Sequence, residues 1–305
     1  MSAAWFSDAA PHELILRRAL LALRARPALL AAFGRFLPSR TSQERWQTFV
    51  DRIAYWDEIR QRSTRDEWAR LTRGVPVLLY HAFDEQRGLG RFVLPKRAFA
   101  RQMLLLSLLR FRVIPYGDFA HALVEGTLPA PRTAVVTIDD GYADNLSVAG
   151  RVLARHGFPA TVFLVSGRLG DVNNWSDAVP LRGRRLLSAE EASTLRKQGL
   201  EVGAHTRSHP SLPDLREQAI VDEVAGSRSD LERALGEPVR VFAYPYGVAG
   251  ERAVECVRRA GFISACTTEP RLAQIADDPF LVPRIEIKGT DSLVRFLVKL
   301  CFGGR

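Results

Sequence analysis

The stretch that decides the fold is Thr133-Ala134-Val135-Val136-Thr137-Ile138-Asp139-Asp140-Gly141. Its first six residues are mostly β-branched, which is typical of a strand buried on both faces of a parallel sheet. Asp139 and Asp140 come directly after this strand, and Gly141 allows a sharp turn. Two adjacent carboxylates at a strand end are costly unless a cation or a proton relieves them. We therefore expect one metal ligand and one base here; an acidic turn before a helix at Asn145 is the structural alternative.

Strands and helices alternate on both sides of this stretch. The hydrophobic pattern predicts strands over 75–80, 160–165, 200–204, 239–244, 262–267 and 281–287, and helices over 96–109, 145–155, 215–235 and 251–260, with a further helix capped by Ser188 and Glu191 and a terminal helix. Such alternation indicates a parallel sheet, either a barrel or doubly wound. In a parallel barrel, functional residues gather at the C-terminal ends of the strands.

The first 73 residues differ from the rest. The segment 13–37 is rich in Leu, Ala and Arg and is interrupted by Pro27, and a helix with Ser42 as N-cap is expected over 42–63. We expect a helical N-terminal extension over 1–73 and an α/β domain over 74–305. The extension either packs on the main domain, lies on an anionic membrane as a basic amphipathic segment, or binds a partner.

Composition narrows the class of protein. The chain has 305 residues, 47% of them hydrophobic, and a formal charge of +9 spread along its length. Nucleic-acid binding is not expected, because no basic cluster is interleaved with aromatic residues. Three cysteines give neither an even disulfide set nor a metal-ligand spacing. With no recognisable secretory signal or membrane span, we expect a cytoplasmic protein, with peripheral contact at the inner membrane face through 13–37.

A second polar group follows the predicted strand 200–204, in the order His205-Thr206-Arg207-Ser208-His209. Spacing of i and i+4 would place both imidazoles on one face of a helical turn, although such a pair often arises by coincidence. Two histidines and one carboxylate with open positions form a catalytic rather than a closed metal site. Imidazole suits zinc and related transition metals.

Two further segments lie at strand ends. Tyr244-Pro245-Tyr246-Gly247 follows the strand 239–244; it is either an ordinary turn or a groove wall whose Tyr246 backbone N–H stabilises an oxyanion. His81 comes directly after the strand 75–80 and has no evident structural task, so it is a candidate general acid. Trp175, in a polar loop, either stacks on a sugar ring or packs against the barrel.

Taken together, residues 74 to about 288 resemble a polysaccharide deacetylase domain, the NodB-homology group of carbohydrate esterase family 4. Thr137-Ile138-Asp139-Asp140-Gly141 is similar to the family's first motif, T-F-D-D-G, and 205–209 matches its second, H-[ST]-x-x-H. Residues 244–247 resemble the third, usually R-x-P-Y. The resemblance implies a distorted (β/α) barrel, Asp139 as catalytic base, and Asp140, His205 and His209 as ligands of a divalent metal, zinc first and cobalt, nickel or manganese as alternatives.

The sequence departs from the family pattern at two places. Ala243 stands where the family's Arg orients the base, and Arg284 is our candidate replacement, with a surface or ion-pair role as the alternative. The late L-x-H motif that carries the general acid is absent. In the circularly permuted subgroup that deacetylates poly-N-acetylglucosamine, this histidine lies on an early strand, and Leu78-Leu79-Tyr80-His81 resembles that segment.

The resemblance implies metal-dependent removal of an N-acyl group, normally N-acetyl, from an amino sugar. The carbohydrate substrate is a polysaccharide, an oligosaccharide, or a lipid- or nucleotide-linked glycan precursor. The alternative is a catalytically weak barrel that binds glycan or scaffolds a glycan-assembly complex, and loss of the usual Arg is its best support.

Overall fold

The computed structural model describes residues 74–303 apart from 87–88, 128, 131 and 179. The predicted helices of the N-terminal extension, and the membrane contact through 13–37, lie outside the described residues. The chain divides into two compact units, 1–73 and 74–305, and the second is described below.

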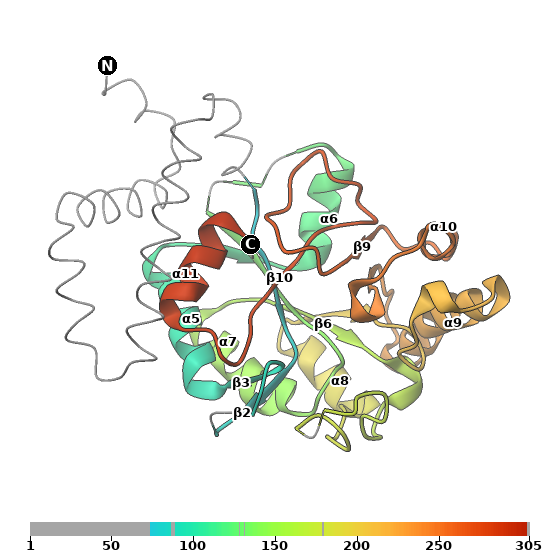
Figure 1. The fold of residues 1–305 in the computed structure, drawn as a ribbon, viewed down its shortest axis with the longest axis horizontal. Coiled ribbons are helices and arrows are strands. Elements are labelled where there is room, and N and C mark those ends of the chain that lie inside the picture. The colour runs from blue at the N-terminus through green and yellow to red at the C-terminus, as the bar shows by residue number, and fades with distance from the viewer. Residues whose placement is uncertain (1–73, 87–88, 128, 131, 179, 304–305) are drawn as a thin grey trace, which may run out of the picture. The chain divides into compact units, whose positions relative to one another are not determined.

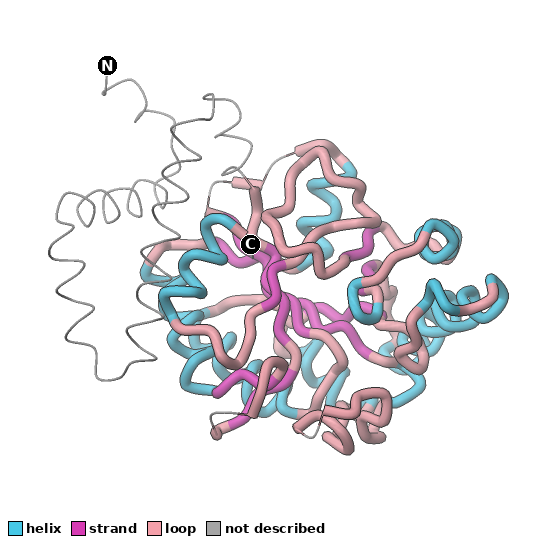
Figure 2. The backbone as a smooth tube through the Cα atoms, in the orientation of Figure 1, coloured by secondary structure: helices cyan, strands magenta, loops and turns pink. Residues whose placement is uncertain are grey.

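An eight-stranded parallel sheet forms the centre of this unit (Figures 1 and 2). Its order is β10-β1-β5-β6-β7-β8-β9, with β4 beside the first half of β5. A parallel bridge between Cys266 and Val282 joins β9 to the chain that leads into β10, so the two ends of the sheet meet. The strands are β1 (Val77–Tyr80), β4 (Arg112–Ile114), β5 (Thr133–Ile138), β6 (Thr161–Leu164), β7 (Glu201–Ala204), β8 (Val241–Ala243), β9 (Ser264–Cys266) and β10 (Ile285–Glu286).

Helices cover the outside of the sheet (Figure 1). They are α5 (Lys96–Leu108), α6 (Tyr116–Val124), α7 (Arg151–His156), α8 (Ala189–Lys197), α9 (Glu217–Leu235), α10 (Glu251–Arg259) and α11 (Leu293–Phe302). The predicted capping box of Ser188 and Glu191 is present in α8, and Gly236 ends α9 in the left-handed conformation. The predicted distorted (β/α) barrel is thereby confirmed for the described part of the chain.

The central strands are buried on both faces, which explains their unbroken apolar sequences. In β5, Val136 and Ile138 pack in the core under the helices, whereas Val135 packs inside the sheet with Phe163 and Val241. Because side chains alternate along a strand, Thr137 and Asp139 follow Val135 on the inner face. This alternation places Asp139 at the open end of the barrel.

Two local predictions need correction, and three short strands were not predicted. Residues 145–150 form a π-helix before α7 rather than one α-helix over 145–155, and its buried Asn145 donates a hydrogen bond to the carbonyl of His81 at 2.9 Å. The strand β10 is only two residues long, because Pro283 lacks the N–H that a strand ladder needs. The three-residue strands β2 (Ala82–Asp84) and β3 (Val93–Pro95), which pair with each other, and β4 were not predicted.

Candidate active site

Asp139 and Asp140 both line a cavity of about 560 Å³ at the C-terminal end of the barrel strands. Strand alternation alone would send consecutive side chains to opposite faces. Asp140, however, adopts a left-handed backbone with φ of 74°, and Gly141 does the same. A Cβ at Gly141 would lie 2.6 Å from the Leu164 side chain, so this turn requires glycine. Both carboxylates are almost fully buried, at 3% and 6% exposed.

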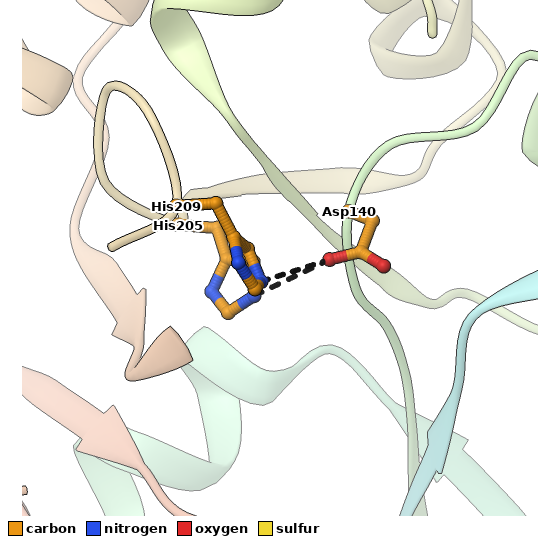
Figure 3. Close-up of side chains that lie close together, drawn as sticks. All are labelled: Asp140, His205 and His209. Carbon is orange, nitrogen blue, oxygen red and sulfur yellow. Dashed lines mark ion pairs between the residues drawn. The ribbon is translucent and has the colours of Figure 1, made fainter. Parts of the chain in front are cut away.

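Asp140, His205 and His209 lie close enough to share one ion (Figure 3). Each offers one ligand atom, and these atoms lie within 4.8 Å of one another. The Oδ1 atom of Asp140 is 3.3 Å from Nε2 of His209 and 3.6 Å from Nε2 of His205. Two imidazoles and one carboxylate suit a zinc-like divalent metal and leave coordination positions open. The donor set therefore fits a catalytic metal.

The histidines converge without the helical turn that we expected from their spacing. Residues 205–209 form a loop, and Thr206 and His209 both have φ of 64°. The Thr206 hydroxyl accepts a hydrogen bond from the backbone N–H of His209 at 3.0 Å and donates one to the His205 carbonyl at 2.5 Å. The Glu223 carboxylate on α9 accepts hydrogen bonds from the backbone N–H groups of Arg207 and Ser208, at 2.8 and 2.9 Å. These side chains close the loop so that both rings face Asp140.

Backbone strain is concentrated at these motifs. Among the described residues, six non-glycine positions have positive φ, and four of them are Asp140, Thr206, His209 and Tyr246. A left-handed conformation costs an L-residue roughly 1–2 kcal/mol, and most of all a β-branched one such as Thr206. Such strain persists where surrounding contacts determine the geometry, as they commonly do at functional sites.

Burial keeps His205 neutral. Loss of hydration lowers the pKa of His205 to about 4, despite the nearby carboxylates that would raise it. Its Nδ1 atom lies 2.7 Å from the carbonyl oxygen of Ala243, and a neutral ring that donates there presents Nε2 as a free lone pair toward Asp140. Burial alone would raise the pKa of Asp140, but the contact with His209 and the nearby histidines hold that pKa well below its usual range.

Arg284 forms a bidentate ion pair with Asp139. Its Nη1 and Nη2 atoms donate to the two carboxylate oxygens at 2.7 and 2.6 Å, and its Nε donates to the Thr267 carbonyl at 2.9 Å. The guanidinium is fully buried. Burial alone would raise the pKa of Asp139, but the Arg284 charge, with help from His205, holds it below the ordinary value. Arg284 thus holds both oxygens of Asp139, although the two residues are 145 positions apart in the chain.

His81 and Tyr246 line the same cavity as the carboxylates. The His81 ring meets the edge of Phe92 with ring centres 5.0 Å apart, and its buried Nδ1 atom has no hydrogen-bond partner among the described residues. The Tyr246 ring is half exposed and packs edge-on against His209 at 4.7 Å. Gly247 is required after it, because a Cβ there would lie 2.1 Å from the Thr268 hydroxyl oxygen.

The sequence singled out Trp175 for stacking on a sugar ring or for packing, whereas the other lining residues named below carry no signal in the sequence. Trp175 stacks on His209 with ring centres 4.8 Å apart, so it packs against a candidate ligand as well as lining the cavity. Other lining residues come from segments far apart in the chain: Arg91, Phe92, Lys288, Arg295 and Lys299. None of them belongs to a motif, and only the closed fold brings them together.

Fold and site define an α/β-barrel whose strand ends carry a buried carboxylate pair and a two-histidine metal constellation. Residues 128–265 match the family model described as polysaccharide deacetylase, which confirms the resemblance drawn from the motifs.

Proteins related in sequence agree with this assignment. YxkH of Bacillus subtilis is 24% identical over 213 residues, which cover 70% of this chain and 71% of YxkH. The poly-β-1,6-N-acetyl-D-glucosamine N-deacetylase of Staphylococcus aureus is 21% identical over 226 residues, covering 71% and 74% of the two chains.

Solved structures share the fold. The Streptococcus pyogenes deacetylase PplD, in complex with acetate, has a TM-score of 0.65 at 21% identity, with 75% of this chain and 99% of PplD covered. IcaB from Ammonifex degensii has a TM-score of 0.62 at 25% identity, with 70% and 91% covered. Within the described residues, none of the helices is both long and apolar enough to span a bilayer.

Proposed function

We propose that this protein is a metal-dependent hydrolase that removes an N-acetyl group from an amino sugar of a glycan. The observation that carries the proposal is the buried Asp139–Arg284 pair beside the Asp140, His205 and His209 constellation. Asp139 is held by an arginine and lies 4.0 Å from His205 alone, whereas Asp140 lies 3.6 and 3.3 Å from two imidazoles. This division suits one base and one metal ligand.

Asp140, His205 and His209 would hold the metal, with zinc expected from the donor set and cobalt, nickel or manganese as alternatives. A divalent ion held there would lower the pKa of a bound water molecule to roughly 7 and would polarise the acyl carbonyl. The neutral state of His205, with its pKa of about 4, keeps its Nε2 lone pair available at neutral pH.

Asp139 is the proposed general base. It is ionised at neutral pH, because Arg284 holds its pKa below the ordinary value. Arg284 binds both carboxylate oxygens, so the group has a fixed orientation, and its remaining lone pairs accept the proton of the attacking water. Arg284 acts here as a positioning residue through Asp139.

The amide carbon gains the water oxygen and loses the amine, which releases acetate and a free amino sugar. Tyr246 supplies a backbone N–H for the oxyanion, and one such donor is worth about 3 kcal/mol. His81 protonates the departing nitrogen, which is otherwise a very poor leaving group. The shared cavity and the unpartnered Nδ1 atom of His81 support this assignment.

A barrel that binds glycan without turnover is the alternative proposal, and the absence of Arg at position 243 is its main support. The ion pair between Arg284 and Asp139 argues against it, because the base has a guanidinium partner from another strand. For the substrate, the name of the Staphylococcus aureus relative supports a poly-N-acetylglucosamine type of chain. Lipid- and nucleotide-linked precursors remain in the proposal.

The test is acetate release from N-acetylated glucosamine oligosaccharides by the purified full chain, with and without added zinc. We expect turnover that Asp139→Asn abolishes while the bound metal is retained. Metal without turnover in the unmodified protein, on amino-sugar polymers and precursors alike, would favour the glycan-binding alternative. Cytoplasmic location and membrane contact through 13–37 are separate proposals, and flotation of the full chain with anionic vesicles tests the latter.

A further inference from the structure

We propose that the cavity contains an anion site, formed by Lys288 and Arg295 with Arg91, that binds a phosphoryl group carried by the amino-sugar substrate. We call this surface the basic wall. The inference rests on the proposed deacetylase function for the identity of the sugar, but the wall itself is described by contacts independent of the metal residues. It defines a substrate class, phosphorylated N-acyl amino sugars, that no motif of the chain indicates.

The fold brings the basic wall to the catalytic residues. The short strand β10 lies beside β1 in parallel register, with Glu286 opposite Leu79. The chain beyond β10 therefore reaches the same barrel edge as His81, which follows β1. Helix α11 then returns along this edge, and its Lys299 donates a hydrogen bond to the Glu286 carbonyl at 2.6 Å (Figure 1). Lys288, Arg91, Arg295 and Lys299 all line the cavity that contains Asp139 and Asp140.

Together with the neighbouring Lys299, the three cations of the basic wall outnumber their acidic partners. Arg91 is neutralised by Glu286, to which its Nε donates at 2.8 and 3.0 Å. Asp291 alone serves two cations, Lys299 at 2.5 Å and Arg295 at 3.1 Å. The Lys288 amine has no ion pair or side-chain hydrogen bond within the described part of the chain. Four cations thus face two carboxylates, which leaves two positive charges at the cavity.

The other acidic groups of the cavity are already engaged. Asp139 is paired with Arg284, and Asp140 faces His205 and His209. Asp177, which also lines the cavity, lies 3.7 Å from Arg182. None of them is left to neutralise Lys288. Lys288 is a partly buried residue that shares the cavity with Arg91, Arg295 and Lys299, and an incoming anion relieves the repulsion among these cations.

Repulsion within the wall is evident at Lys299. Burial, above all, and then the charges of Arg295 and Lys288 lower the pKa of Lys299, against the favourable effect of Asp291. The backbone of Lys288 is held by its N–H, which donates to Asp291 at 2.9 Å, so the side chain extends from an ordered segment.

Charge and donor geometry favour phosphate over other anions. A phosphate monoester carries a charge of about −1.5 to −2 at neutral pH, which matches the two unneutralised cations. Arginine binds phosphate through its planar fork, and lysine adds a compact point charge. A carboxylate supplies only one negative charge, and a neutral polymer of N-acetylglucosamine supplies none. The basic wall is therefore better matched to a phosphoryl group.

The position of the wall indicates where the phosphoryl group is attached. The Arg91 guanidinium lies over Phe92, 5.1 Å from its ring centre, and Phe92 in turn meets His81. His81 is the proposed donor to the departing nitrogen, so the wall flanks the nitrogen side of the reacting amide. In a 2-acylamino sugar, carbons 1 and 3 both adjoin the carbon that bears this nitrogen, and carbon 1 is the one that carries the phosphoryl group in nucleotide- and lipid-linked sugars. We therefore assign the phosphoryl group to carbon 1.

Binding tests the inference separately from catalysis. Calorimetry on the full chain as isolated compares N-acetylglucosamine with its 1-phosphate and with UDP-N-acetylglucosamine at low salt. We expect at least one phosphorylated ligand to bind about tenfold more tightly than the neutral sugar, since one charge-assisted hydrogen bond is worth that much. Preferential binding of either phosphorylated ligand supports the site. Comparing the 1-phosphate with UDP-N-acetylglucosamine distinguishes a monoester from a nucleotide-linked substrate.

Variants locate the binding energy. Lys288→Ala should weaken binding of the phosphorylated ligand about tenfold and leave binding of the neutral sugar unchanged. Lys288→Arg should retain the preference for the phosphorylated ligand. The matched control is Lys197→Ala, an exposed lysine at the end of α8. Raising the salt concentration should reduce the preference. N-acetylmuramic acid, whose anion is a carboxylate, should bind less tightly than the 1-phosphate.

Three results would overturn the inference: equal binding of neutral and phosphorylated sugars, no phosphorylated ligand bound at about 10 mM, or a preference that Lys288→Ala leaves intact. Acetate release from a neutral oligosaccharide without phosphate preference would disprove the basic wall and leave the proposed function standing. Preferential binding of phosphorylated sugars without acetate release from any substrate would support the basic wall and disprove the proposed function.

Discussion

Arg284 and Asp139 are 145 positions apart in the chain, yet the guanidinium donates to both oxygens of the carboxylate at 2.7 and 2.6 Å inside the barrel. The pair is fully enclosed, with Thr137 and Thr267 accepting further hydrogen bonds from the same arginine. A buried carboxylate with such a partner remains ionised and has only one orientation. This relationship supports our proposal that Arg284 takes the place of the motif arginine and orients Asp139 as the base.

Loss of the Arg284 charge should affect both activity and stability. Arg284→Met leaves Asp139 as an unpaired buried charge, which costs about 3–5 kcal/mol in the free energy of unfolding. We expect kcat to fall about a hundredfold or more with a smaller effect on KM. The midpoint of urea unfolding should move to a lower urea concentration. Combining Arg284→Met with Asp139→Asn should recover much of the stability and none of the activity. Unchanged kcat in Arg284→Met would exclude the positioning role.

Removal of the His81 imidazole should affect amide substrates more than esters. General acid catalysis contributes about 10²–10⁴-fold to the rate. The alcohol of an activated ester departs with much less need of a proton than the amine of an amide. His81→Asn should reduce acetate release from an N-acetyl sugar by at least a hundredfold, with a much smaller loss on an activated acetate ester. His121→Asn, in the exposed part of α6, is the control. Equal losses on both substrates would refute the acid assignment.

The loop that carries the histidines should depend on Glu223. This carboxylate accepts from two consecutive backbone N–H groups, and its removal frees the turn that orients His209. Outer-shell partners of metal ligands are typically worth 10–100-fold in metal affinity. Glu223→Ala should weaken zinc binding by such a factor in a competition assay with a chromogenic chelator. Glu255→Ala, a surface glutamate paired with Arg259 on α10, should leave the affinity unchanged.

Acid should destabilise the metal-free protein through His205. Its pKa is about 4 in the folded chain and about 6.5 when unfolded, so between these values the unfolded chain binds a proton that the folded chain excludes. Stability therefore falls as pH drops from 6.5 toward 4, by about 3 kcal/mol from this group. Urea unfolding at pH 7 and pH 4.5 should show this loss, and His205→Gln should reduce the difference. Equal pH dependence in the two proteins would contradict the buried neutral state.

The sequence was most informative where chemistry and burial coincide. The strand at 133–138 and both of its carboxylates were predictable, because a strand buried on both faces must be apolar throughout and its polar end stands out. The spacing of His205 and His209 correctly indicated that they converge. Their helical turn was wrong, because positive φ at Thr206 and His209 curls the chain in a way that spacing does not encode.

The features that the sequence did not predict depend on tertiary structure. The predicted strand at 281–287 shrinks to two residues, because Pro283 interrupts the ladder and the Arg284 side chain enters the barrel. The three-residue strands β2 and β3 are too short for an alternation pattern to show. Arg91, Lys288 and Arg295 come from separate segments, so only the folded chain reveals that they line one cavity.

The central claim is that Asp140, His205 and His209 bind one divalent ion that the chain needs for hydrolysis. The most direct test is metal content by mass spectrometry on the purified full chain, alongside acetate release. Our account predicts about one zinc-type ion per chain, lost in His209→Ala together with activity, whereas His156→Ala, at the end of α7, keeps both. Full activity in a metal-free chain, or an undiminished metal content in His209→Ala, would contradict it.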